Sequence, residues 1–148
     1  MKLTYTPWNL IIGVLLFGFL MADARATCYK QAADSYKVNA RVLKAIALTE
    51  SGENPLAVAT NTNKTEDIGL MQINSIHLPG LVSRGIGKKE LLDGCTNVKV
   101  AAQLLREKMN RWGNNWRAVG AYHSETPHLN AKYQTRVYAQ YTQLVAMK

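Results

Sequence analysis

The sequence has few residues that commonly bind metals: only two cysteines and three histidines among its 148 residues. Cys28, Cys95, His77, His123 and His128 do not follow the spacing of a known metal site. The chain also lacks a glycine-rich phosphate-binding loop and a recognisable motif around a serine or cysteine nucleophile. We therefore expect no bound metal and no cofactor, and we exclude nucleotide-binding and serine- or cysteine-nucleophile chemistry.

Acidic side chains are also scarce. The 18 lysines and arginines exceed the 10 aspartates and glutamates, which gives a formal net charge of +8. Nucleic acid is one possible anionic partner, but the basic residues are scattered and no nucleic-acid-binding motif is present, so we expect none. A negatively charged matrix outside the cytoplasm, such as cell wall, fits the N-terminus of the chain better.

That N-terminus carries an apolar run, at residues 10–21, which is shorter than the ~20 residues needed to span a bilayer. Lys2 precedes the run, and small residues follow it in the pattern that signal peptidase accepts, at Ala22, Ala24 and Ala26. We therefore predict that residues 1–26 are a cleaved signal peptide and that the exported protein has no stable membrane anchor. An uncleaved anchor is the alternative.

The predicted exported part, residues 27–148, keeps both cysteines. Because export permits oxidation, we predict a disulfide between Cys28 and Cys95. In the chain-entropy model a loop of this length contributes roughly 4 kcal/mol. Two unpaired buried thiols are the alternative.

Residues 27–148 are long enough for one compact domain, and they contain no internal repeat or linker rich in glycine or proline. Apolar spacing and capping residues predict helices. In chain order these run from Cys28 to before Asn39, from Asn39 to Gly52, from Val98 to Gly113, from Asn115 through Tyr122, and through Tyr133 to Val145. Between Asn54 and Ile76 the helical period is lost, so we expect loop and a small hairpin, followed by a helical turn around residues 88–92. The predicted fold class is mainly α (α+β).

Glu50 continues the apolar stripe that Leu43 and Ile46 form on the second predicted helix, and Gly52 suits the end of that helix. Burial and the negative end of the helix dipole both raise the pKa of a carboxyl group in this position. A carboxylic acid that is still protonated near neutral pH is what cleavage of a glycosidic bond requires. Considered alone, a solvated or salt-bridged surface glutamate is the more common explanation.

Two sequence motifs favour a catalytic Glu50 over a surface glutamate. Residues 50–55, Glu-Ser-Gly-Glu-Asn-Pro, and residues 69–74, Gly-Leu-Met-Gln-Ile-Asn, resemble the two linked signatures of the lysozyme-like lytic transglycosylase domain. Residues 97–102 resemble the family's next helix, residues 118–122 its tyrosine segment, and residues 133–137 its closing helix. The resemblance implies a lysozyme-like fold, with a small β or irregular region flanking a glycan-binding cleft, and cleavage of peptidoglycan strands.

The resemblance also implies roles for residues on opposite sides of the predicted cleft. Glu50 would be the catalytic acid and base, with Ser51 beside it, and Tyr122 would face Glu50 across the cleft. Ser51 is also compatible with a simple helix-end hydroxyl. Where many members of the family have an asparagine after the tyrosine, this chain has His123 and Ser124, which leaves the polar contact there open.

The second signature supplies the remaining substrate-binding candidates. By resemblance, Gly69 would let the backbone approach the sugar, Met71 and Gln72 would shape the glycan groove, and Asn74 would lie near the same edge. Met71 is equally compatible with core packing.

Asp67 lies 17 residues after Glu50, a spacing similar to that of the two carboxylates in animal-type lysozymes. A retaining hydrolase uses a second carboxylate about 5 to 5.5 Å away as nucleophile, and water completes the reaction. A transglycosylase needs one acid, because the acetamido group of the substrate assists departure and its 6-hydroxyl closes a 1,6-anhydro ring. Asp67 is more simply explained by hydrogen bonds from its side chain to the backbone that organise the hairpin turn. We predict anhydro products, because the resemblance to transglycosylases covers the whole exported part whereas the similarity to lysozymes depends on one residue; a muramidase using Glu50 and Asp67 is the alternative.

The resemblance is closest to the small transglycosylases that accompany secretion systems, conjugation machines or type IV pili in Gram-negative envelopes. It implies a periplasmic, monomeric enzyme that cleaves the MurNAc-GlcNAc β-1,4 bond and opens the wall locally with components of such a machine as partners. A non-catalytic wall-binding or assembly module on the same fold is the alternative of a different class, and the presence of Glu50 argues against it.

Overall fold

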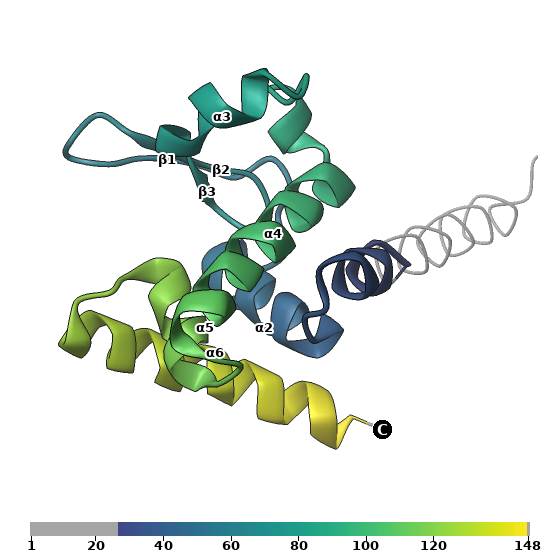
Figure 1. The fold of residues 1–148 in the computed structure, drawn as a ribbon, viewed down its shortest axis with the longest axis vertical. Helices are drawn as coiled ribbons and strands as arrows, with labels where there is room; N and C mark the ends of the chain where they lie inside the picture. Colours follow the sequence, from purple (N-terminus) through teal and green to yellow (C-terminus); the bar gives the residue numbers. More distant parts are fainter. Residues whose placement is uncertain (1–26, 148) are drawn as a thin grey trace, which may run out of the picture.

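The computed structural model describes residues 27–147, so the predicted signal peptide lies outside the described residues. Helical residues 27–36 come first. They are followed by α2 (Ala40–Ser51), β1 (Val58–Thr60), β2 (Glu66–Ile68), β3 (Ile73–Asn74), η1 (Ser75–His77), α3 (Leu78–Val82), η2 (Glu90–Leu92), α4 (Gly94–Trp112), α5 (Trp116–His123) and α6 (Pro127–Ala146). The described part is thus mainly helical with one small sheet, which confirms the predicted lysozyme-like α+β fold class (Figure 1).

Side-chain caps set the limits of the main helices. The side chain of Asn39 accepts hydrogen bonds from the first turn of α2, and Gly52 ends that helix in the left-handed conformation, with φ 64°. Asn115 caps α5 in the same way as Asn39 caps α2, and α4 ends at Gly113 as predicted. The start of α4 is earlier than Val98, because the Asp93 side chain accepts a hydrogen bond from the backbone of Thr96 and adds a turn.

The three strands form one antiparallel sheet in the order β1-β2-β3. The hairpin predicted between Asn54 and Ile76 is present as β1 and β2, and β3 extends it. The register pairs Asp67 with Ala59 on one side and with Asn74 on the other. The sheet therefore places the side chains of Asp67 and Asn74 next to each other.

The helix α3 is a feature that the sequence analysis did not predict. It contains Pro79 and Gly80, which usually indicate a loop, but proline is tolerated in the first turn of a helix because no helical bond needs its N–H. Leu81 fixes α3 on the domain through a buried side chain. The helical turn expected around residues 88–92 is present as η2.

The core lies where α2, α4, α5 and α6 meet. Leu43 and Ile46 from α2, Leu105 from α4 and Val137 from α6 are completely buried there. Figure 1 shows α4 running through the molecule, with the sheet and α3 toward one of its ends and α5 and α6 toward the other. The end of α2 thus comes to lie between the sheet and α6.

The predicted disulfide between Cys28 and Cys95 is present and joins helical residues 27–36 to the first turn of α4, with 5.2 Å between the two Cα atoms. Arg106 supports the same junction, because its guanidinium donates to the backbone carbonyls of Tyr36 and Lys37 at the end of the first helix. Within residues 27–147, no helix is both long enough and apolar enough to cross a membrane.

Candidate active site

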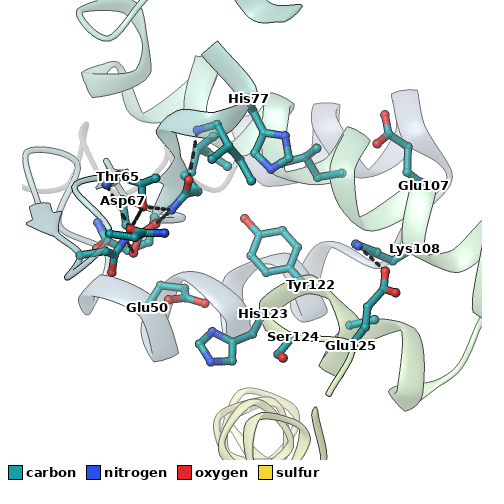
Figure 2. A pocket seen from close by; sticks show the side chains of 18 of the residues that line it. Glu50, Thr65, Asp67, His77, Glu107, Lys108, Tyr122, His123, Ser124 and Glu125 are labelled. Atoms are coloured by element: carbon teal, nitrogen blue, oxygen red, sulfur yellow. Dashed lines mark hydrogen bonds and ion pairs between the residues drawn. The ribbon is translucent and has the colours of Figure 1, made fainter. Parts of the chain in front are cut away.

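A cleft of about 710 Å³ lies between the sheet and helices α4 and α5. Five of the predicted site residues line it: Glu50, Asp67, Gln72, Asn74 and Tyr122. Figure 2 shows Tyr122 pointing into the cleft, with Asp67 and Glu50 on one side and Lys108 and Glu125 on the other. The cleft is therefore lined mainly by polar side chains, as a site for a sugar polymer requires.

Glu50 stands in the last turn of α2, as predicted, and is half-buried. The hydroxyl of Tyr133 donates a hydrogen bond of 2.5 Å to its Oε1 atom. Burial raises the pKa of Glu50; the hydrogen bond from Tyr133 and the positive charge of Arg136 partly oppose this shift, and the negative charge of Asp67 adds to it. Glu50 thus combines an elevated pKa with one fixed oxygen, which leaves Oε2 to carry the proton.

Tyr133 contributes to the site, although the sequence motifs indicate only its place in the closing helix. The side chain is 2% exposed, and burial, followed by the charge of Glu50, raises its pKa well above the ordinary value. The available signal was the spacing of Tyr133 and Val137 on one buried helical face, because a buried tyrosine hydroxyl needs a polar partner. Arg136, which donates to the carbonyl of Thr49, joins the same part of α6 to α2.

Asp67 is held by two side-chain amides. Nδ2 of Asn61 donates to Oδ2 over 2.9 Å, and Nδ2 of Asn74 donates to Oδ1 over 2.7 Å. Both amides also donate to the hydroxyl of Thr65. The carboxylate therefore links the segments on either side of β2 through side-chain amides, whereas the expected hydrogen bonds were to the backbone. It also lines the cleft that Glu50 occupies.

The profile of the transglycosylase SLT domain matches residues 27–144 of this chain. The chain belongs to the transglycosylase SLT family. Protein IpgF of Shigella flexneri is 37% identical over 137 residues, which cover 89% of this chain and 90% of that protein. Invasion protein IagB of Salmonella typhimurium strain LT2 is 37% identical over 129 residues, covering 84% of this chain and 81% of IagB. The peptidoglycan-binding-like protein of Escherichia coli O157:H7 is 35% identical over 136 residues, covering 84% and 81% of the two chains.

As a member of this family, the protein is a lytic transglycosylase whose substrate is peptidoglycan. In this transglycosylase, the interior of the domain explains why residue 69 has no side chain. We had expected the reason to be a contact with the sugar. The φ of Gly69 is +76°, and a Cβ there would lie 2.4 Å from Nδ2 of Asn97 and from the carbonyl oxygen of Leu91. The missing side chain thus makes room for the interior of the domain rather than for the substrate.

Asn97, which the sequence analysis did not identify as important, fills that space and is completely buried. Its Nδ2 donates to the carbonyls of Ile68 and Leu91, and its Oδ1 accepts from the backbone N–H of Met71 over 2.7 Å. One amide therefore fixes the turn between β2 and β3 on α4. Because that turn carries Gln72 into the cleft, Asn97 supports the groove without touching it.

Met71 and Ser51 were predicted to contact the substrate, but neither is among the described residues that line the cleft. Met71 is completely buried, so its side chain belongs to the core, the alternative that the sequence left open. The hydroxyl of Ser51 donates to the carbonyl of Leu70 and accepts from the backbone N–H of Asn54. Ser51 therefore joins the end of α2 to the second signature instead of projecting toward the sugar.

Tyr122 lines the same cleft as Glu50, but its hydroxyl bonds a backbone carbonyl rather than the Glu50 carboxyl. It donates to the carbonyl of Met71 over 3.0 Å, and burial raises the pKa of Tyr122 well above the ordinary value. Tyr122 thus spans from α5 to the turn between β2 and β3 and fixes the width of the cleft at that point.

Proposed function

We propose that the protein cleaves the β-1,4 bond between MurNAc and GlcNAc with Glu50 as both acid and base, and that the products end in 1,6-anhydromuramic acid. The observation that carries this proposal is the position of Glu50: a half-buried carboxyl with a raised pKa, held at Oε1 by Tyr133 and facing a polar cleft of about 710 Å³. These are the properties of a proton donor to a leaving sugar oxygen.

In the proposed reaction, protonated Glu50 donates its proton to the oxygen of the departing GlcNAc while the acetamido oxygen of MurNAc bonds to C1. The resulting Glu50 carboxylate then accepts the proton of the MurNAc 6-hydroxyl. The 6-oxygen attacks C1, the bond from C1 to the acetamido oxygen breaks, and the anhydro ring closes. Glu50 ends the cycle protonated, so no water is consumed.

Asp67 in this proposal orients the sugar and does not attack it. Its support is the pair of amide hydrogen bonds from Asn61 and Asn74, which engage both carboxylate oxygens. The second candidate is a muramidase in which Asp67 is the nucleophile. It is favoured by one observation, that Asp67 and Glu50 line the same cleft.

Mass spectrometry of the muropeptides released from purified sacculi distinguishes the two. We expect products without a reducing end, lighter by one water than the hydrolytic products, and partial activity in Asp67→Asn. Glu66→Gln is the matched control. It removes the carboxylate next to Asp67 in the sequence, which pairs with Lys88 and is not among the described residues that line the cleft. Hydrated products that borohydride reduces, together with an inactive Asp67→Asn, would replace this proposal with the muramidase.

We further propose that the enzyme is exported to the periplasm of a Gram-negative bacterium and opens the wall locally for a secretion, conjugation or pilus machine. The similarity to small enzymes of that kind and the name of the relative IagB, an invasion protein, support this role. N-terminal sequencing of the protein from the periplasm tests export, and the sequence should begin near Thr27. Chromosomal Glu50→Gln should reduce the number of assembled machines per cell without changing bulk wall turnover; unchanged assembly would contradict the role.

A further inference from the structure

His123 occupies the end of α5 and lines the cleft (Figure 2). Its imidazole stacks on the ring of Tyr133, with 4.9 Å between the ring centroids and 11° between the planes. Tyr133 is almost completely buried, and its hydroxyl donates to Glu50. The histidine ring therefore lies between solvent and the tyrosine that holds the catalytic carboxyl.

We propose that His123 is a positioning residue that acts on Glu50 through Tyr133. Its ring covers the tyrosine and keeps water away from the hydroxyl that bonds Glu50, and so holds the Glu50 carboxyl in one orientation for cleavage. Because the ring is neutral, it does not favour the ionised form of Glu50. The inference rests on the proposed function, because it takes Glu50 to be the catalyst.

The backbone that carries His123 is fixed to α6 by one buried side chain. Nδ2 of Asn130 donates to the carbonyls of Arg117, near the start of α5, and of Ser124, just after its end. Gly120 makes this approach possible, because a Cβ there would lie 2.2 Å from Oδ1 of Asn130. His123 is thus anchored to the same helix as the ring that it covers, and the stack does not depend on an unattached loop.

The charges around His123 favour its neutral form. Burial and then the cation of Arg136 on α6 lower the pKa of His123, while Asp67 on β2 opposes the shift. Glu50 on α2, Tyr133 on α6 and Tyr122 on α5 are further titratable groups near the stack. A histidine that is neutral at the pH of the reaction adds an apolar cover over Tyr133, whereas a charged one would favour the ionised form of Glu50.

Three substitutions of His123 separate the effect of the stacked ring from the effect of a positive charge. His123→Phe keeps a neutral stacked ring, His123→Arg keeps a stacked but charged plane, and His123→Ala removes the cover. On purified glycan strands we expect kcat to fall about tenfold in the alanine variant with KM unchanged, and to recover to within about threefold in the phenylalanine variant. The alkaline limb of the pH profile should stay in place for phenylalanine and move to lower pH for arginine, by about one unit.

The exposed His128 at the start of α6 supplies the control, because His128→Ala removes a histidine that does not line the cleft. Equal kcat values for the alanine and phenylalanine variants, an unmoved alkaline limb in His123→Arg, or an effect confined to KM would overturn the inference. Glu50→Gln is assayed in parallel. Activity retained in Glu50→Gln would contradict the proposed function itself. An inactive Glu50→Gln together with wild-type behaviour in every His123 variant would contradict only the role of His123.

Discussion

Replacing Tyr133 with phenylalanine removes a single hydroxyl from the site and frees Oε1 of Glu50. The hydrogen bond from Tyr133 favours the ionised carboxylate, because it lowers the pKa of Glu50 against the larger effect of burial. Without that donor the pKa of Glu50 rises further. The alkaline limb of the pH-rate profile, where the acid loses its proton, should therefore move to higher pH, opposite to the shift expected for His123→Arg.

The size of the shift follows from the strength of the bond. A hydrogen bond to a charged group contributes about 1.5 to 3 kcal/mol, and one pKa unit corresponds to about 1.4 kcal/mol. The expected movement is thus about one to two pH units, and the half-buried position of Glu50 favours the lower end of that range. At the pH optimum, kcat should also fall about tenfold, because the carboxyl is no longer held in one orientation.

The assay is the initial rate of cleavage of purified glycan strands over a series of pH values, with thermal melting of each variant. Tyr138→Phe is the matched control: this tyrosine lies on the same helix but is 50% exposed and packs on Trp116 away from the cleft. An alkaline limb that stays in place or moves to lower pH in Tyr133→Phe would refute the assigned role of the tyrosine.

Three further predictions concern stability and the catalyst. Glu50→Gln should abolish cleavage and raise the melting temperature at neutral pH by up to about 3 °C. Because the folded state raises the pKa of Glu50, the ionised carboxylate destabilises the fold. The gain in melting temperature should therefore vanish as the pH falls below about 4.3, where the carboxyl is protonated in both states. A lower melting temperature at neutral pH would contradict this. Gly69→Ala should cost at least about 2 kcal/mol in denaturant unfolding, because of its positive φ and the clash on its inner side, whereas Gly80→Ala, with no atom near its Cβ position, should be close to neutral. Reduction of the disulfide between Cys28 and Cys95 should lower the free energy of unfolding by about 4 kcal/mol, measured with and without reductant, and an unchanged value would refute the stabilising role.

The helices that could be predicted from the sequence are those with local signals. Asn39, Gly52, Asn115 and Gly113 act within one turn of the helix that they limit, so their effect depends on neighbouring residues only. The short helix α3 was missed because its proline and glycine are the residues typical of loops. The packing of Leu81 and Leu78 against the rest of the domain stabilises it.

The sequence alone determined the position of Glu50 at a helix end, the pairing of the two cysteines, and the two motifs on which the assignment to a glycan-cleaving family depends. These features depend on short segments of the sequence or on the number of cysteines, so they can be recognised without knowing how the segments pack together.

Tertiary structure decided which side chains of those motifs face the cleft. It placed Met71 in the core, gave Gly69 an internal neighbour in Asn97, and brought Tyr133 from the last helix to Glu50. Tyr133 and Glu50 are 83 residues apart, so their contact exists only because α2 and α6 pack against each other. The protonation of Glu50 depends on burial and on neighbouring charges, and both are set by packing between distant segments.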